Sequence, residues 1–131
     1  MDEGERYFPH VSGLPDYSRG NDERYPGINI YRVNIHRGYC LPWKGIYVPK
    51  TVSEAYVQHE YGHYLQYRKW GALYYSQVII KSIWSVMRFN NDYQHMRIAV
   101  ELEANTMAHD FFGEHSFLNN SAYPTYYNCM L

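Results

Sequence analysis

Two short segments in the first half of the chain carry the hydrophobic pattern of β-strands. Residues 28–35 (INIYRVNI) are rich in β-branched side chains and nearly alternate between apolar and polar positions. The alternation slips at Ile30 and Tyr31, which predicts a bulge in this strand. Residues 45–49 (GIYVP) predict a second strand that ends at Pro49. Together the two segments predict a small N-terminal sheet.

Residues 51–70 predict the first of three helices. The sequence TVSE at 51–54 has the spacing of a capping box, in which Thr51 accepts a hydrogen bond from the Glu54 N–H. Gly71 is a typical residue to end the helix. One broad face of a helical wheel collects eight residues and predicts the inward side of the helix: Val52, Tyr56, His59, Glu60, His63, Gln66, Tyr67 and Trp70.

Two further helices are predicted over about 73–88 and 94–112, the second ending at Gly113. Residues 1–27 and 114–131 show no sustained period and predict irregular chain. We therefore expect one domain over residues 1–131. Its fold class is α+β, with a small N-terminal sheet packed on a helical core.

The composition favours a folded protein without a nucleic-acid partner. Hydrophobic residues make up 46% of the chain and charged residues 19%, which allows a packed core. The net charge of -1 and the lack of a basic stripe argue against nucleic-acid binding. The chain has 16 tyrosines, which we expect to be half-buried with their hydroxyls at the solvent.

No segment has the pattern of a confident membrane anchor or signal peptide. The most apolar stretch, 72–89, contains Lys81, Gln77 and three serines, so it predicts a buried or interfacial helix rather than a bilayer span. The first ten residues are acidic and lack the apolar region of a signal peptide. The location of the protein stays open, including export as part of a larger protein.

The two cysteines, Cys40 and Cys129, do not have the spacing of a cysteine-based zinc site. They are compatible with a single disulfide or with two free thiols, and the sequence does not choose between these states.

The segment QHEYGHYLQ at 58–66 contains the strongest chemical signal. His59 and His63 are four residues apart, so on a helix both imidazoles point the same way and can reach one metal ion. Two imidazoles suit Zn²⁺, which would take a third protein ligand and keep a position for water. Glu60, directly after the first histidine, is placed to act as the general base for that water.

The third helix offers a second group of candidates in ELEAN at 101–105. Glu101 is followed four residues later by Asn105, on a helix downstream of the HExxH helix. The combination resembles the gluzincin metallopeptidases, in particular compact bacterial HExGHxxQ…ExxAN domains that also occur at the C-terminal ends of toxin-like proteins. The resemblance covers roughly residues 51–112.

The resemblance implies zinc bound by His59, His63 and Glu101, with Glu60 as base. Asn105 stands where the family usually has an aspartate, so it would orient His59 without adding charge. The large second domain of familiar gluzincins has no counterpart at this length. A metzincin is excluded, because its spacing needs Gly at 66 and His at 69, where this chain has Gln66 and Lys69.

The third ligand is a choice between Glu101 and Glu103, because residues two apart point roughly 200° from one another on a helix. Glu101 shares its side with Ala104, Asn105 and Ala108, where small residues would let the HExxH helix come close. The alternative is that Glu101 is no ligand and only forms an exposed ion pair with Arg97, four residues before it. Glycine at 62 likewise predicts close approach of a neighbouring element.

The expected function is hydrolysis of a peptide or protein substrate by a zinc peptidase, with the strand at 45–49 pairing with the extended substrate. An effector-type protease domain released from a larger chain and a non-enzymatic metal-binding module are the alternatives. His95, His109 and His115 are candidates for an oxyanion donor, although each is more often a structural histidine.

Overall fold

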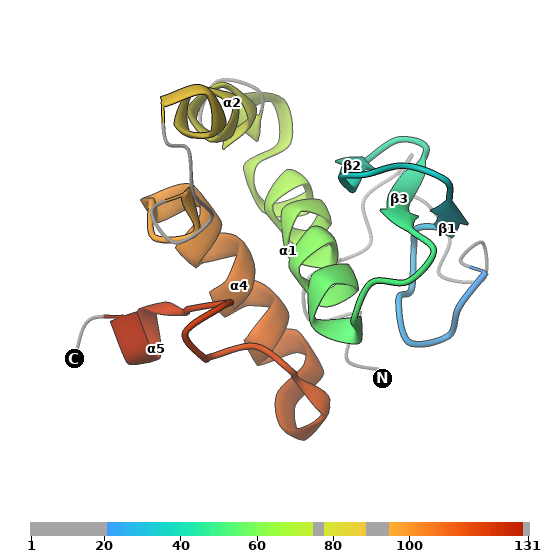
Figure 1. Cartoon of the computed structure of the whole chain (residues 1–131). Helices are drawn as coiled ribbons and strands as arrows, with labels where there is room; N and C mark the ends of the chain where they lie inside the picture. The colour runs from blue at the N-terminus through green and yellow to red at the C-terminus, as the bar shows by residue number, and fades with distance from the viewer. Residues whose placement is uncertain (1–20, 75–77, 89–94, 130–131) are drawn as a thin grey trace.

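The structure is a computed structural model that describes residues 21–74, 78–88 and 95–129. It confirms the predicted α+β class, with a three-stranded sheet beside a group of helices (Figure 1). The elements in chain order are β1 (Ile30–Val33), β2 (Tyr39–Leu41), β3 (Gly45–Pro49), α1 (Glu54–Trp70), η3 (Gly71–Leu73), α2 (Ile80–Arg88), α4 (Ala99–Phe112), η5 (Gly113–His115) and α5 (Tyr126–Cys129).

β3 lies in the middle of the sheet, between β1 and β2. It pairs in parallel with β1 and antiparallel with β2. The register from Ile30 to Val33 is unbroken, so the bulge predicted in this strand is wrong. The prediction that residues 45–49 pair with a substrate is also wrong, because both edges of β3 already carry a neighbouring strand. β2, which the hydrophobic pattern did not predict, is an edge strand.

α1 runs through the centre of the molecule, between the sheet and α4 (Figure 1). Every residue from Val57 to Gln66 is buried. The single inward face predicted for this helix was therefore too narrow: the HExxH side faces α4, while Val57, Tyr61 and Leu65 join the core cluster that includes β3. A helix enclosed on both sides does not need one apolar stripe.

α1 begins two residues later than the capping box predicts. Ser53 is the N-cap, and its hydroxyl accepts from the Tyr56 N–H at 3.3 Å. The Glu54 carboxylate is occupied by other donors, since Tyr25 Oη donates to it at 2.6 Å and Arg32 lies at 3.1 Å. The Thr51 cap is therefore wrong. The predicted end at Gly71 is confirmed, because Gly71 has φ +58° and donates to the Tyr67 carbonyl.

Four tyrosines belong to the core and are more deeply buried than expected, while several others are half-buried as predicted. Tyr25, Tyr61 and Tyr64 are almost fully covered. Tyr61 and Tyr64 donate their hydroxyl protons to the carbonyls of Pro26 and Gly27, at 2.7 and 3.1 Å. These hydroxyls therefore tie the segment before β1 onto α1 instead of reaching the solvent.

The close approach predicted at Gly62 is confirmed. A Cβ atom at this position would overlap the backbone of Ala104 on α4. Ala104 and Ala108 are completely buried. Small residues on both helices thus bring the HExxH face of α1 against the side of α4 that carries Glu101 and Asn105.

The second predicted helix, about 73–88, is helical wherever it is described: η3 ends at Leu73, Tyr74 is helical, residues 78–79 form a π-helical turn, and α2 follows from Ile80. Residues 75–77 of this prediction lie outside the described residues. The third helix is shorter than predicted. α4 begins at Ala99, because Ile98 is extended with ψ 156°, and residue 94 of this prediction also lies outside the described part. Over the described ranges, no helix is long and apolar enough to cross a bilayer.

The two predicted irregular ends agree only in part. Residues 21–27 form turns and bends, and residues 1–20 lie outside the described ranges. The C-terminal segment is mostly irregular, although it contains η5 and the short α5. Gly113 ends α4 as predicted, with φ +58° and a hydrogen bond from its N–H to the His109 carbonyl.

Candidate metal centre

Three buried side chains from two helices meet between α1 and α4. His59 and His63 lie one turn apart on α1, and Glu101 comes from the first turn of α4. The Nε2 atoms of both histidines lie 3.3 Å from Oε1 of Glu101. One ligand atom from each residue lies within 4.8 Å of the other two, so the group could hold a metal ion. These are the three residues that the sequence singles out as ligands.

The spacing of this group fits a small tetrahedral ion. Zinc with bonds of about 2.0–2.1 Å separates neighbouring ligand atoms by about 3.3–3.4 Å. The two measured distances to Glu101 agree with such an edge. In addition, Oε2 of Glu101 is buried without a hydrogen-bond partner among the described residues. A carboxylate that is 1% exposed and has an unsatisfied oxygen is costly unless a cation or water meets it.

Each histidine is held through its outer nitrogen. Asn105 Oδ1 lies 2.7 Å from Nδ1 of His59, where the sequence predicts this contact, and the Asn105 amide donates to the Pro124 carbonyl at 2.9 Å. Gln66 Oε1 lies 2.8 Å from Nδ1 of His63. With Nδ1 protonated, both rings donate outward and keep the Nε2 lone pair toward the centre. Sequence reasoning gave Gln66 no role, although it lies one turn after His63.

The charges at the centre are strongly coupled when no metal is bound. Burial would raise the pKa of Glu101, but the charge of His63 and hydrogen bonds from His59, His63 and His95 outweigh it and hold this pKa well below its usual range. Burial would lower the pKa of His63, yet Glu101, with a smaller contribution from Glu60, raises it to about 9. Without a metal ion, a proton on His63 thus supplies the positive charge beside the Glu101 carboxylate. Binding of a metal ion would displace this proton.

Glu60 lies beside the three candidate ligands and lines the same cavity. Its side chain is buried. Within the described ranges, no hydrogen bond or ion pair engages its carboxylate. Both oxygens are therefore available to a molecule in the cavity, which is what a general base needs.

Among the described residues, His95 is the one additional histidine in contact with Glu101. Its Nε2 lies 3.2 Å from Oε1 of Glu101, and its Nδ1 lies 2.9 Å from the hydroxyl of Ser85 on α2. In one continuous helix, residues six apart would be separated by about 9 Å along the axis. The break before Ala99 allows His95 to fold back onto Glu101. Because Nε2 faces Glu101, the contact favours a positioning role over the oxyanion role for which the sequence offered His95 as one candidate.

We predict that His95 and Ser85 support metal binding through Glu101. Replacing either residue by alanine should weaken zinc affinity by about 10–100-fold, the range for residues that orient a ligand. His109 provides a matched control, because it forms a similar pair with Ser116, 2.9 Å away, outside the cavity. Chelator competition on the three variants tests the prediction. Equal affinities for His95→Ala and His109→Ala would contradict it.

Glu103, the rival to Glu101, points toward the C-terminal end of α1 and away from His59 and His63. Its carboxylate accepts from Trp70 Nε1 at 2.6 Å and from Lys69 Nζ at 3.0 Å. The structure therefore separates the two acids as the helix geometry predicts. The alternative of an exposed Arg97–Glu101 pair is wrong, because Glu101 is buried and the guanidinium of Arg97 donates to the Ser121 carbonyl.

The remaining candidates do not join the centre. His115 is exposed, and its imidazole lies 3.7 Å from the neighbouring Glu114 carboxylate. Cys40 is a free, buried thiol that lines the cavity, and burial, with the nearby Glu60, raises its pKa well above its usual value. The structure thus favours a free thiol over a disulfide at Cys40; the side chain of Cys129 lies outside the described part.

The candidate metal group lies in a cavity of about 1160 Å³ between the sheet and the helices. One wall consists of residues 38–41, which include β2, and another consists of α2 residues such as Ile83 and Met87. A cavity of this size accepts a segment of several residues rather than only a water molecule.

No protein-family model, curated protein or solved structure matches this chain. The resemblance to gluzincins therefore stays a prediction from the HExxH and ExxAN motifs, while the structure shows a His59-His63-Glu101 group that could hold a metal ion.

Proposed function

We propose that this protein is a zinc-dependent hydrolase that cleaves peptide bonds. The observation that carries the proposal is the arrangement of four buried residues at one cavity. His59, His63 and Glu101 supply the donor set of a catalytic zinc site, which typically uses three protein ligands. Glu60 stands beside them with a carboxylate that no group of the described residues engages. A purely structural zinc site has no need of such an acid.

The proposed roles follow from these positions. Zinc bound at this centre would lower the pKa of a water molecule and polarise the scissile carbonyl. Glu60 takes the proton of the attacking water and passes it to the nitrogen of the departing amine. Asn105 and Gln66 keep His59 and His63 in the tautomer that leaves Nε2 deprotonated.

β2 is the strand that we expect to align the substrate. It lies at the edge of the sheet, and residues 38–41 line the cavity next to the candidate metal group. An extended peptide could add to this edge through main-chain hydrogen bonds, which is a common way to bind peptides with little dependence on sequence. We thus assign to β2 the pairing with substrate that the sequence suggested for residues 45–49.

Metal analysis and peptide cleavage together test the proposed function. Protein purified without chelators should contain about one zinc per chain, and His63→Ala should lose most of it. Wild-type protein should cleave members of a diverse peptide library in mass-spectrometric assays. A chelator should stop cleavage, and added zinc should restore it.

The outcomes separate the proposal from its rivals. Equal zinc in wild type and His63→Ala would overturn the metal site. Stoichiometric zinc without cleavage of any peptide would favour a non-enzymatic metal-binding module. Cleavage of one protein target alone would favour an effector-type protease.

A further inference from the structure

α2 packs with its polar side inward and its apolar side outward. Ile80, Ile83, Trp84 and Met87 follow the i, i+3, i+4, i+7 spacing of one helix face, and each is between 55% and 74% exposed. We call these four residues the outer face of α2. On the opposite side, Ser85 is 2% exposed and contacts His95. A surface helix of a globular protein normally buries its apolar stripe, so this reversed arrangement indicates a partner.

The charged residues within α2 are both positive. From residue 71 to residue 88 the chain contains two cations, Lys81 and Arg88, and no acid. On a helical wheel both cations flank the apolar stripe on the same side, near Trp84. An apolar stripe with tryptophan and a basic border is typical of helices that lie in the interface of an anionic membrane.

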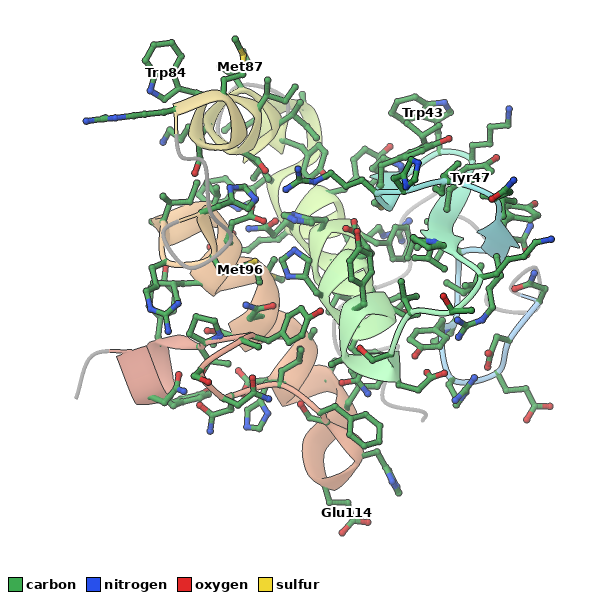
Figure 2. The ribbon with its side chains drawn as sticks, viewed as in Figure 1. Trp43, Tyr47, Trp84, Met87, Met96 and Glu114 are labelled. Carbon is green, nitrogen blue, oxygen red and sulfur yellow. The ribbon has the colours of Figure 1, made fainter. Side chains whose placement is uncertain are left out.

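A second element presents apolar surface to the same side of the molecule. Figure 2 shows Trp43, from the connection between β2 and β3, at the same edge as Trp84 and Met87 of α2. Trp43 is exposed, and the cation Lys44 follows it. Two separate protrusions on one side suit a broad, flat partner such as a bilayer, because a protein partner would need a pocket for each.

From these observations we infer that the outer face of α2, together with Trp43, docks on an anionic membrane surface. The helix lies in the headgroup region, with its apolar side chains among the acyl chains and its cations near lipid phosphates. Ile83 and Met87 also line the cavity, so docking places the cavity mouth at the membrane surface. The inference does not depend on the proposed peptidase activity.

Vesicle sedimentation of the full chain tests this surface. Wild-type protein should bind vesicles of phosphatidylcholine mixed with phosphatidylglycerol, bind pure phosphatidylcholine more weakly, and lose affinity as salt rises. A variant with Ile83→Ser, Trp84→Ser and Met87→Ser should bind at least about tenfold more weakly. Phe117→Ser is the matched control, because Phe117 is equally exposed on another part of the surface.

Three results with these proteins would contradict docking on a membrane. Absence of wild-type binding to anionic vesicles would overturn it, as would equal binding by wild type and the triple variant. A wild-type dimer that the triple variant dissociates, without vesicle binding, would assign the outer face of α2 to a second copy of the chain. Circular dichroism verifies that the variants remain folded, and repeating the assay with chelator separates docking from metal binding.

Discussion

Glu60→Gln should reduce peptide hydrolysis by about 10²–10⁴-fold while leaving zinc content and fold unchanged, because an amide cannot take the proton of the attacking water. The substitution preserves the size of the side chain. It also breaks no hydrogen bond or ion pair among the described residues, since none engages the Glu60 carboxylate. A loss of activity would therefore report on proton transfer and not on lost packing.

The measurement compares wild type and Glu60→Gln on the same peptide at matched zinc content. Glu114→Gln is a suitable control, because Glu114 is exposed at the far end of the molecule from α2 (Figure 2). Both variants lose one carboxylate, but only Glu60 lines the cavity. Cleavage by Glu60→Gln at the wild-type rate would show that another group is the base.

Local patterns explain why so much of the candidate site could be predicted from the sequence. The four-residue spacing of His59 and His63 places both imidazoles together on any helix. Gly62 and Ala104 indicated a close helix contact, and the structure places the Glu101 side of α4 against α1 at that contact. Each of these predictions needs only helix geometry and side-chain size.

The parts that were missed depend on breaks in the chain or on distant partners. His95 reaches Glu101 because α4 does not begin until Ala99, and no side-chain cap at Ile98 announces that start. Gln66 contacts His63 locally, but its amide is fixed by the Val100 carbonyl on another helix at 2.7 Å. Such contacts follow from the packing of α1 on α4, which periodicity does not specify.

The sheet also contains a strand that the hydrophobic pattern could not predict. A strand of three residues such as β2 is too short to produce an alternating pattern, so its presence between β3 and the cavity was not predicted. The order β1-β3-β2 places β2, and not β3, at the edge of the sheet. The strand expected to pair with a substrate therefore changed from β3 to β2. For α2, the sequence predicted a buried or interfacial helix. The structure shows that one side is buried and the apolar side is exposed.

The choice of the third ligand leads to the largest expected effect on metal binding. Glu101→Ala should lower zinc affinity by more than about 100-fold, since removal of a ligand should exceed the 10–100-fold cost of losing a residue that orients one. In the structure Glu101 lies 3.3 Å from both His59 and His63. Glu103 instead accepts hydrogen bonds from Lys69 and Trp70 in the last turn of α1.

Glu103→Ala is the matched control, because it removes the same side chain two residues away on the same helix. It has one indirect link to the centre: Gln66, which contacts His63, also donates to Glu103 at 3.1 Å. Gln66 keeps its shorter bond to the Val100 carbonyl in this variant, so we expect a change of at most a few-fold. The loss seen with Glu101→Ala should be far larger.

Chelator competition at fixed pH measures both affinities, and Glu101→Gln serves as a second variant in case the alanine protein unfolds. Glutamine fills the same space and accepts hydrogen bonds from the surrounding histidines, but it is a much poorer zinc ligand than a carboxylate. Strong loss of zinc in both Glu101 variants, with retention in Glu103→Ala, is the expected result. The opposite ranking would mean that Glu103 is the ligand, and that the side of α4 facing His59 and His63 has been assigned incorrectly.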